Sequence, residues 1–301
     1  MYKKIQNLIK KSSNILLISH RRPDPDTLGS ALALNLYLKS QNKNTVLACI
    51  DKPHNDFSFL PHINEYVSKF KSSDFNLVFF LDAGDHKMTK FHITNPELFT
   101  KQIPVINIDH HASNDFYGTI NIVDTSAAST TVLITELLQK LKSQITPSIA
   151  TCLMTGLYSD TGSFMHSNTD RRALETAAIL SKKGADIETI RKQIFTGKDI
   201  DTLHLWGKAL EKTTLTENSV AISILSPQDI EESNNAHCGG VVDYINMVKG
   251  SKFAILLKVD KNENIKGSLR TENEKINLSK LANKFGGGGH RKAAGFFIKR
   301  K

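Results

Sequence analysis

The triplet Asp109-His110-His111 places three ionisable side chains in a row, directly after the apolar segment from Pro104 to Ile108. Such a segment is typical of a buried strand, and ionisable groups at its end are costly to desolvate unless they have partners. A carboxylate combined with imidazoles suits a hard or borderline divalent cation. The triplet therefore predicts a metal site at the end of a strand.

Three other segments also place acidic or histidine side chains next to apolar residues. They contain His20, Asp24 and Asp26, then Asp82, and finally Asp160. Two prolines stiffen the first of these loops, so its side chains can be presented rigidly. Each segment has an ordinary structural interpretation as well, because Asp26 is well placed to cap the following helix, and an aspartate in a glycine-containing loop is usually a turn residue. The four segments taken together are much harder to ascribe to chance.

The elements that must position these residues alternate between strand and helix patterns over the first two-thirds of the chain. Buried strands are predicted at Asn14–Ser19, Thr45–Ile50, Asn76–Leu81 and Val105–Ile108. Helices are predicted at 27–40, 126–142, 147–157 and 170–183. This alternation is typical of an α/β fold with a mostly parallel sheet flanked by helices. Parallel strands end at a common edge, where ligands bind in open α/β sheets, so the side chains that follow three of these strands should meet there.

The donor types favour a site for two cations. Two divalent ions about 3.5–4 Å apart need a bridging carboxylate and several further ligands. No cysteine takes part and carboxylates outnumber imidazoles, which favours Mn²⁺ or Mg²⁺ over structural Zn²⁺. The candidate ligands are His20, Asp24, Asp26, Asp82, His110 and Asp160.

The pattern changes after residue 186. A charged helical stretch is followed by β patterns at Ser219–Leu225, Phe253–Val259 and Ile265–Arg270, and a short helix at Leu278–Phe285 precedes four consecutive glycines. We therefore predict an N-terminal domain over 1–186, a helical linker over 187–214 and a smaller C-terminal α/β domain over 215–301.

The composition is that of an ordinary globular protein with a mild preference for polyanions. The 301 residues provide for two cores, and a net charge of +9 favours nucleotides or nucleic acid as partners. Three cysteines without a CxxC spacing predict reduced thiols rather than a disulfide or zinc site. Neither a signal peptide nor an apolar run of roughly 18 residues is present. We therefore expect a soluble cytoplasmic protein without a membrane partner.

The four acidic and histidine segments, in this order, resemble the four motifs of the DHH phosphoesterase superfamily. Near the other end, the segment Gly267–Arg270 and the run from Phe285 to Gly295 resemble the DHHA1 domain. The resemblance covers nearly the whole chain, and the two-domain length is most similar to the nanoRNase/pAp-phosphatase group. One departure is Thr271, where the family often has serine, but both residues carry a hydroxyl.

The resemblance implies two Mn²⁺ ions per chain, with Mg²⁺ or Co²⁺ as substitutes. One ion would be held by His20, Asp24 and Asp82. The other would share Asp82 as a bridging ligand and would also bind three further side chains, Asp26, His110 and Asp160.

The resemblance also implies catalytic roles for Asp82, Asp109 and His111. Asp109 would orient a histidine ligand through its ring N–H. His111 would face the phosphate and would stabilise it or help to protonate the leaving oxygen. The structural alternative for His111 is a histidine that only packs or supports a ligand.

The C-terminal motifs are expected to choose the substrate. Backbone N–H groups of a glycine run can form an anion-binding concavity, and arginine can grip phosphate through two hydrogen bonds. A flexible linker is the alternative for the glycines, but an apolar helix precedes them and an apolar run follows, which favours a fixed turn. The expected substrate-binding residues are Ser268, Arg270, Gly287, Gly288, Gly289 and His290.

The resulting hypothesis is a Mn²⁺-dependent phosphohydrolase that works in a cleft between its domains. It would degrade oligoribonucleotides of two to about five nucleotides to mononucleotides and remove the 3′-phosphate of pAp. It would not bind long nucleic acid tightly. The sequence does not decide between a monomer and a homodimer. The nearest alternative is a phosphodiesterase for c-di-AMP or pApA of the same superfamily. An alternative from another class is a non-catalytic nucleotide- or RNA-binding module.

Overall fold

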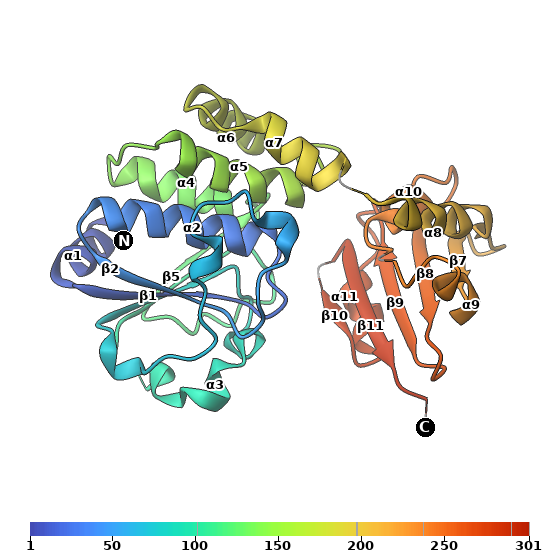
Figure 1. Cartoon of the computed structure of the whole chain (residues 1–301), viewed down its shortest axis with the longest axis horizontal. Coiled ribbons are helices and arrows are strands. Elements are labelled where there is room, and N and C mark those ends of the chain that lie inside the picture. The colour runs from blue at the N-terminus through green and yellow to red at the C-terminus, as the bar shows by residue number, and fades with distance from the viewer. Residues whose placement is uncertain (101, 197, 237, 290, 301) are drawn as a thin grey trace. The chain divides into compact units, whose positions relative to one another are not determined.

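The computed structural model describes residues 1–300 apart from 101, 197, 237 and 290, and it divides into two compact units, Met1–Thr196 and Gly197–Lys301 (Figure 1). Each unit has its own sheet and its own apolar cores. Within the described part of the chain, no helix has both the length and the apolar character that crossing a bilayer requires.

The first unit is built on a five-stranded sheet in the order β2-β1-β3-β4-β5, in which all neighbouring strands are parallel. The strands are β1 (Asn14–Ser19), β2 (Asn44–Ala48), β3 (Leu77–Leu81), β4 (Val105–Asp109) and β5 (Ile120–Val123). The predicted parallel sheet is confirmed. The edge strand β5 was not predicted, because it has only four residues and its pattern is too short to stand out.

Helices cover this sheet, and both of its faces are buried (Figure 1). On β1, Ile15 and Leu17 face one core, and Leu16 and Ile18 face the other. Burial on both faces explains the uninterrupted apolar runs of these strands. The helices are α1 (Tyr2–Lys11), α2 (Pro25–Ser40), α3 (Phe91–Thr94), α4 (Thr130–Lys140), α5 (Pro147–Asp160), α6 (Arg171–Lys182) and α7 (Ile187–Arg191). Short 3-10 helices are η1 (Asn55–Phe57), η2 (Ile63–Glu65), η3 (Ser72–Asp74), η4 (His86–Thr89) and η5 (Pro96–Phe99).

The stretch predicted as a linker is shared between the two units. Helix α7 continues into a π-helical turn at Lys192–Thr196, and Ile190 is buried in the first unit. Helix α8 (Ile200–Glu211) buries Leu205 and Ala209 in the core of the second unit. The apolar side of α8 therefore makes it part of the second unit rather than a free connector.

The second unit contains a six-stranded mixed sheet in the order β10-β11-β9-β8-β7-β6. Strands β7 and β8 are parallel, and the other neighbours are antiparallel. The strands are β6 (Thr214–Leu215), β7 (Val220–Leu225), β8 (Phe253–Val259), β9 (Ile265–Arg270), β10 (Gly288–Gly289) and β11 (Ala293–Ile298). This confirms the predicted second α/β fold and its β8–β9 hairpin.

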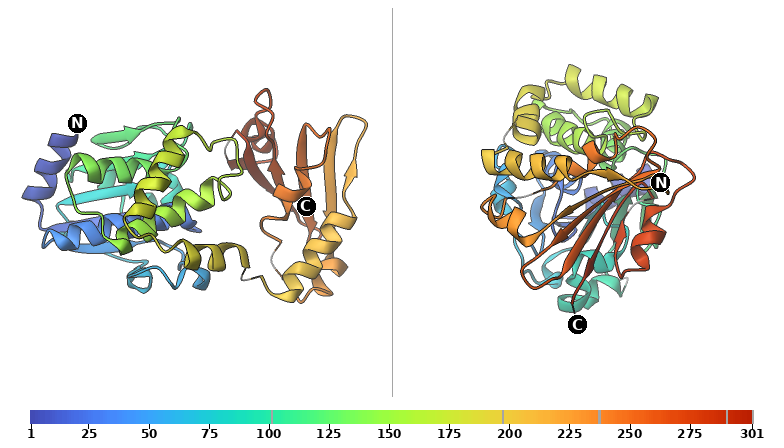
Figure 2. Two further views of the ribbon diagram at one scale, coloured as in Figure 1. Left: turned by 90° about the horizontal axis from the view of Figure 1, so that it is seen from above. Right: turned by 90° about the vertical axis from the view of Figure 1, so that its right-hand side faces the viewer.

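Different helices pack on the two faces of the second sheet (Figure 2). Helix α8 covers one face together with α9 (Pro227–Glu231) and α10 (Val241–Ile245), over Ala254 and Leu256. Helix α11 (Leu278–Asn283) packs on the other face, against Leu269. The helices α9 and α10 have only five residues each, which is too short for a clear helical period in the sequence.

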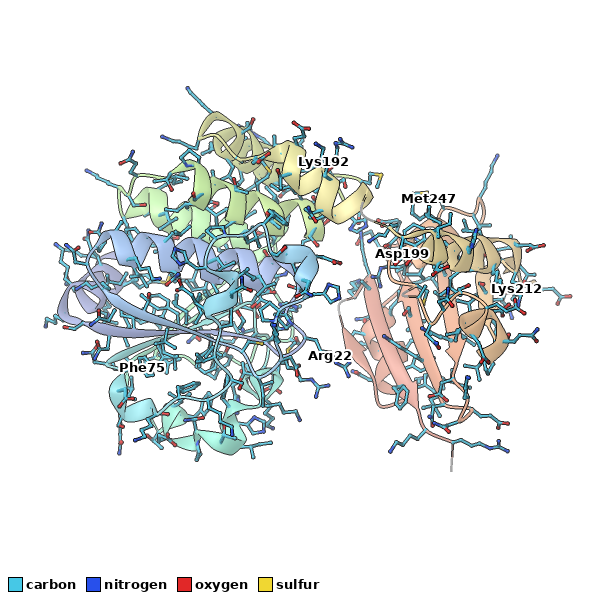
Figure 3. The ribbon with its side chains drawn as sticks, in the orientation of Figure 1. Arg22, Phe75, Lys192, Asp199, Lys212 and Met247 are labelled. Carbon is cyan, nitrogen blue, oxygen red and sulfur yellow. The ribbon has the colours of Figure 1, made fainter. Side chains whose placement is uncertain are left out.

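An ion pair ties the end of α8 to α9. Lys212, labelled in Figure 3, donates to Asp229, which also accepts from the backbone N–H and hydroxyl of Ser226 at 2.7 Å each. Burial opposes ionisation of Asp229, but these hydrogen bonds outweigh it and lower its pKa to about 2. A carboxyl with a lowered folded-state pKa stabilises the fold above its unfolded pKa and loses this effect as the pH falls through the folded value.

We therefore expect Asp229→Asn to lower the stability of the protein at pH 7 by about 1.5 kcal/mol, as for hydrogen bonds to a charged group. The difference from the wild type should narrow as the pH falls below about 4. Urea unfolding between pH 7 and pH 3 measures both, with exposed Glu217→Gln as the charge control. A difference that stays constant with pH would contradict the role of the ionised carboxylate.

Candidate metal centre

The predicted ligands of the first unit come together at one edge of its sheet. His20 follows β1, Asp82 follows β3 and Asp109 ends β4. The register aligns these strand ends, because Ser19 pairs with Leu81 and Leu81 pairs with Ile108. The side chains that follow these parallel strands therefore lie at one edge of the sheet, as we predicted from the sequence.

One group of possible ligands contains His20, Asp24 and Asp82. The Nε2 atom of His20 lies 3.5 Å from Oδ2 of Asp24 and 3.5 Å from Oδ2 of Asp82. These distances are long for hydrogen bonds. They are close to the spacing of roughly 3.0–3.4 Å between neighbouring donor atoms that each lie about 2.1 Å from one cation.

A second group contains Asp26, His110 and Asp160, and it also faces Asp82. The Nε2 atom of His110 lies 3.3 Å from Oδ2 of Asp160, 3.6 Å from Oδ1 of Asp82 and 3.9 Å from Oδ2 of Asp26. Asp82 therefore turns one oxygen toward His20 and the other toward His110. This is the arrangement that a bridging carboxylate requires.

The electrostatics of the centre fit a bound cation. Burial, followed by repulsion from neighbouring carboxylates, raises the pKa values of Asp26 and Asp160 well above the usual range. Burial acts in the same direction on Asp82, but His20, His110 and His111 hold its pKa well below the usual range. Buried carboxylates that repel one another in this way are relieved by positive charge. The donors are all oxygen or nitrogen, so the residues fit the divalent metals of the predicted site.

Two helix N-termini position Asp24 and Asp26. Asp24 caps α2, since its carboxylate accepts from the backbone N–H groups of Asp26 and Thr27 at 3.1 Å each. Asp26 is fully buried and accepts from the first N–H groups of α4, those of Thr130 at 2.7 Å and Thr131 at 3.0 Å. The N-cap of α2 is therefore Asp24, whereas the structural interpretation of the sequence assigned a capping role to Asp26. The proline after Asp24 starts the helix two residues earlier than the apolar pattern suggested.

The three residues of the triplet at the end of β4 make different contacts. Buried Asp109 accepts a 2.6 Å hydrogen bond from Nδ1 of His111 and another of 2.6 Å from the side-chain amide of Asn114. The ring of His110 is held by its Nδ1, 3.2 Å from the carbonyl oxygen of Ala127. Asp109 thus orients His111, the residue expected to face the phosphate, while a backbone carbonyl holds the expected ligand His110.

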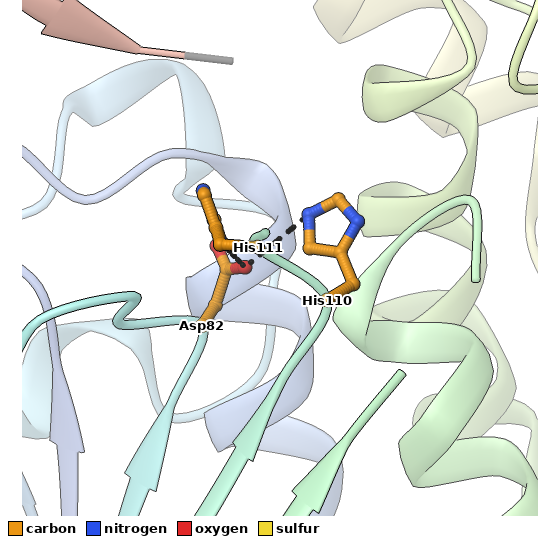
Figure 4. A group of neighbouring side chains, drawn as sticks. All are labelled: Asp82, His110 and His111. Carbon is orange, nitrogen blue, oxygen red and sulfur yellow. Dashed lines mark ion pairs between the residues drawn. The ribbon is translucent and has the colours of Figure 1, made fainter. Parts of the chain in front are cut away.

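The surroundings of His111 favour its cationic form. Burial lowers its pKa, but the hydrogen bond to Asp109 and the nearby charge of Asp82 outweigh burial and raise the pKa to about 9. His111 also lies close to Asp82, with Nδ1 at 3.5 Å from Oδ1 (Figure 4). At neutral pH this side chain therefore carries a proton that it can donate.

Sequence reasoning missed residues that hold the ligands. The hydroxyl of Thr130 donates to Oδ1 of Asp82 at 2.9 Å, and Asn114 fixes Asp109. A Cβ atom on Gly156 would lie 2.7 Å from Oδ1 of Asp26, so this glycine on α5 makes room for the carboxylate. Thr130 and Asp82 are 48 residues apart, and the only local signal was the polar start of a predicted helix.

We expect Thr130→Val to raise the metal concentration needed for half-maximal activity by about tenfold, because it removes a hydrogen bond to a charged group. Thr130→Ser keeps the hydroxyl and should retain most of the affinity. Thr135→Val is the matched control, since this buried threonine of α4 donates only to a backbone carbonyl within its own helix. A titration of metal binding on the three variants measures the effect, and equal affinities would exclude this role for Thr130.

The expected substrate-binding residues lie in the second unit. Ser268 and Arg270 are on β9, and the Nε of Arg270 donates to Asp243 of α10 at 2.7 Å. The glycines are fixed rather than flexible, because Gly288–Gly289 form β10 and pair with β11, and a Cβ on Gly287 would collide with the backbone of Gly295 at 2.1 Å. His290 lies outside the described residues.

Comparisons with known proteins agree on the family. Residues 14–157 match the DHH family N-terminal domain, and residues 217–301 match the DHHA1 domain. The chain is 30% identical to the bifunctional oligoribonuclease and PAP phosphatase NrnA of Mycoplasma genitalium, over 98% of this chain and 92% of that protein. It is 29% identical to the NrnA of Thermus thermophilus, over 95% of this chain and 84% of that protein. The cyclic-di-AMP phosphodiesterase PdeA of Listeria monocytogenes is 29% identical over 95% of this chain, but over 45% of its own length.

A solved structure shares the fold of nearly the whole chain. The exopolyphosphatase-related protein of Bacteroides fragilis superimposes with a TM-score of 0.89 at 23% identity, covering 98% of this chain and 90% of that one. A likeness at this identity concerns the fold. It therefore agrees with the fold of each unit and of the sheet within it.

Proposed function

We propose a function that follows from the family of this chain. The chain belongs to the DHH/DHHA1 phosphoesterases, and these proteins are metal-dependent hydrolases. The proposed activity is hydrolysis of oligoribonucleotides of two to about five nucleotides to mononucleotides, together with removal of the 3′-phosphate of pAp. The NrnA relatives, which match along almost their full length, support this choice. The described cysteines are all free, which suits the reducing cytoplasm that we propose as its compartment.

One observation carries the proposal: the two carboxylate oxygens of Asp82 face two different groups of ligands. We propose that His20 and Asp24 complete the first group, and that three side chains complete the second, Asp26, His110 and Asp160. Two bound divalent ions, for which we propose Mn²⁺, would neutralise charge on the phosphoryl oxygens and lower the pKa of water.

The chain's own residues position the substrate and move a proton. The protonated ring of His111 suits an anionic phosphate and can supply a proton to the leaving oxygen. Asp109 fixes this ring through Nδ1 and so sets the direction in which the imidazole faces. Asp109 is itself held by Asn114, so the orientation of His111 depends on a chain of buried hydrogen bonds.

In the second unit, we propose that Ser268 and Arg270 of β9 bind the substrate, together with the glycine run and His290. The ion pair between Arg270 and Asp243 orients the guanidinium along the sheet face. Arg270 would then act on binding rather than on the chemical step.

A panel of substrates tests this function. Hydrolysis rates would be compared with Mn²⁺ on a 2-mer, a 5-mer and a 24-mer RNA, on pAp, and on c-di-AMP and pApA. We expect the 2-mer to be cut fastest among the RNAs and pAp to be dephosphorylated. Cleavage of the 24-mer as fast as the 2-mer would show that the preference for short RNA is wrong.

The same panel addresses a second candidate, a phosphodiesterase for c-di-AMP or pApA. The similarity to the cyclic-di-AMP phosphodiesterase of Listeria monocytogenes supports it, although this chain matches less than half of that protein. A clear preference for c-di-AMP over the 2-mer RNA would favour this second function.

A further inference from the structure

Four neighbouring side chains are among those that β8, β9 and β11 project to one face of the second sheet. Lys258 pairs with Lys266 across β8 and β9, and Lys266 pairs with Phe297 across β9 and β11. Ser268 lies two residues along β9 from Lys266, so both point to the same side. We call Lys258, Lys266, Ser268 and Phe297 the lysine face.

The charges of this face are not balanced within the unit. Like charges directly opposite each other on an antiparallel pair are destabilising. In the part of the chain that the structure describes, neither Lys258 nor Lys266 forms an ion pair, whereas Arg270 on the same strand as Lys266 pairs with Asp243. Two facing lysines without a carboxylate are a stability cost that an anionic ligand would remove.

A cavity lies between these groups. Its volume is about 80 Å³, and it is lined by Cys238, Gly239, Leu256, Lys258, Lys266 and Ser268. Two lysines and a serine therefore line one small hollow, and their side chains are donors that suit a phosphate group. Leu256 is buried beneath it, so the floor of the hollow is a packed core and not a mobile loop.

An aromatic ring borders the same lysines. The side chain of Phe297 is 53% exposed, which is unusual for a phenylalanine within a strand. Its neighbour Phe296 instead faces the opposite side and packs against the core with α11. Proteins that bind single-stranded nucleic acid combine cationic side chains for the phosphates with exposed aromatic rings on which bases stack.

We propose that the lysine face binds the end of the substrate that is not cut: Lys258, Lys266 and Ser268 hold a terminal phosphate, and Phe297 stacks on the adjacent base. The inference rests on the proposed function and extends it, because it makes a phosphorylated end a determinant of specificity. Arg270 contributes to substrate binding as proposed above, but it shares its charge with Asp243. Lys258 and Lys266 add positive charge on this face that no carboxylate of the described residues pairs with.

The test measures binding apart from turnover, in a full-length Asp82→Asn background. The dissociation constants of pApA, which has a terminal phosphate, and of ApA, which lacks one, would be compared before and after Lys258→Met/Lys266→Met. We expect pApA to bind about tenfold more weakly, as for lost hydrogen bonds to a charged group, and ApA to change less than about twofold. Phe297→Leu should weaken both ligands by about tenfold through the lost stacking.

The matched control is Lys275→Met/Lys280→Met, which removes the same charge. Lys280 lies on α11, which packs on the opposite face of the sheet. Unchanged binding of pApA in the Lys258/Lys266 variant, or equal weakening of pApA and ApA, would overturn the inference. A failure of the proposed function would give a different result. The wild type would then hydrolyse no short RNA, but Lys258→Met/Lys266→Met would still weaken the binding of pApA.

Discussion

Replacing Asp82 with asparagine is expected to reduce hydrolysis of a 2-mer RNA by about a thousandfold or more. The carboxylate faces both groups of proposed ligands, so the substitution would remove a charged donor from each proposed cation and disturb their spacing. A loss of this size corresponds to about 4 kcal/mol of transition-state stabilisation. Steady-state kinetics with saturating Mn²⁺, together with the metal content of the purified variant, measure the effect.

Asparagine is a better test than alanine because of the backbone at this position. Asp82 has a φ of +59°, in the left-handed region that asparagine and aspartate tolerate better than other side chains. Alanine would add backbone strain to the loss of the ligand. The control is Asp170→Asn, which removes a charge from the same unit and still provides a good cap for α6. Near-normal turnover by Asp82→Asn would rule out a bridging carboxylate.

Removal of divalent metal is expected to abolish turnover and to lower the thermal stability of the first unit. Burial and repulsion between neighbouring carboxylates oppose the ionised forms of Asp26 and Asp160 when no cation is bound. A ligand that binds only the folded state stabilises it by about 2.7 kcal/mol at one hundred times its dissociation constant. For a domain of this size, that is a difference of roughly 5–10 °C in melting temperature between chelated and Mn²⁺-loaded protein.

The measurement is calorimetry and activity in EDTA, followed by the addition of excess Mn²⁺. Asp160→Asn is the informative variant, because it relieves repulsion in the metal-free protein and should reduce the stabilisation by Mn²⁺. Fewer than one bound metal per chain, with no activity on adding Mn²⁺, would instead favour the non-catalytic nucleotide-binding module.

The first sheet could be predicted from the sequence because its strands are buried on both faces. The runs 15–18 and Leu77–Leu81 are apolar throughout, and the alternation of such strands with helices leaves few other topologies. The shortest elements could not be predicted, because β5, α9 and α10 form in the context of their neighbours and not from their own pattern. The unit to which α8 belongs could not be predicted for the same reason. It follows only from the packing of α8 in the same core as Ala221 and Ala254.

The sequence by itself determined which side chains meet at the metal centre. Parallel strands must end at one edge, so His20, Asp82 and Asp109 had to converge once the strands were recognised. Only the tertiary structure decided how each side chain is held. The carboxylate of Asp26 is fixed by N–H groups more than one hundred residues away, and Asp109 pairs with His111. The contacts of Asp26 depend on how α2, α4 and α5 pack around Gly156, and no local pattern in the sequence encodes that packing.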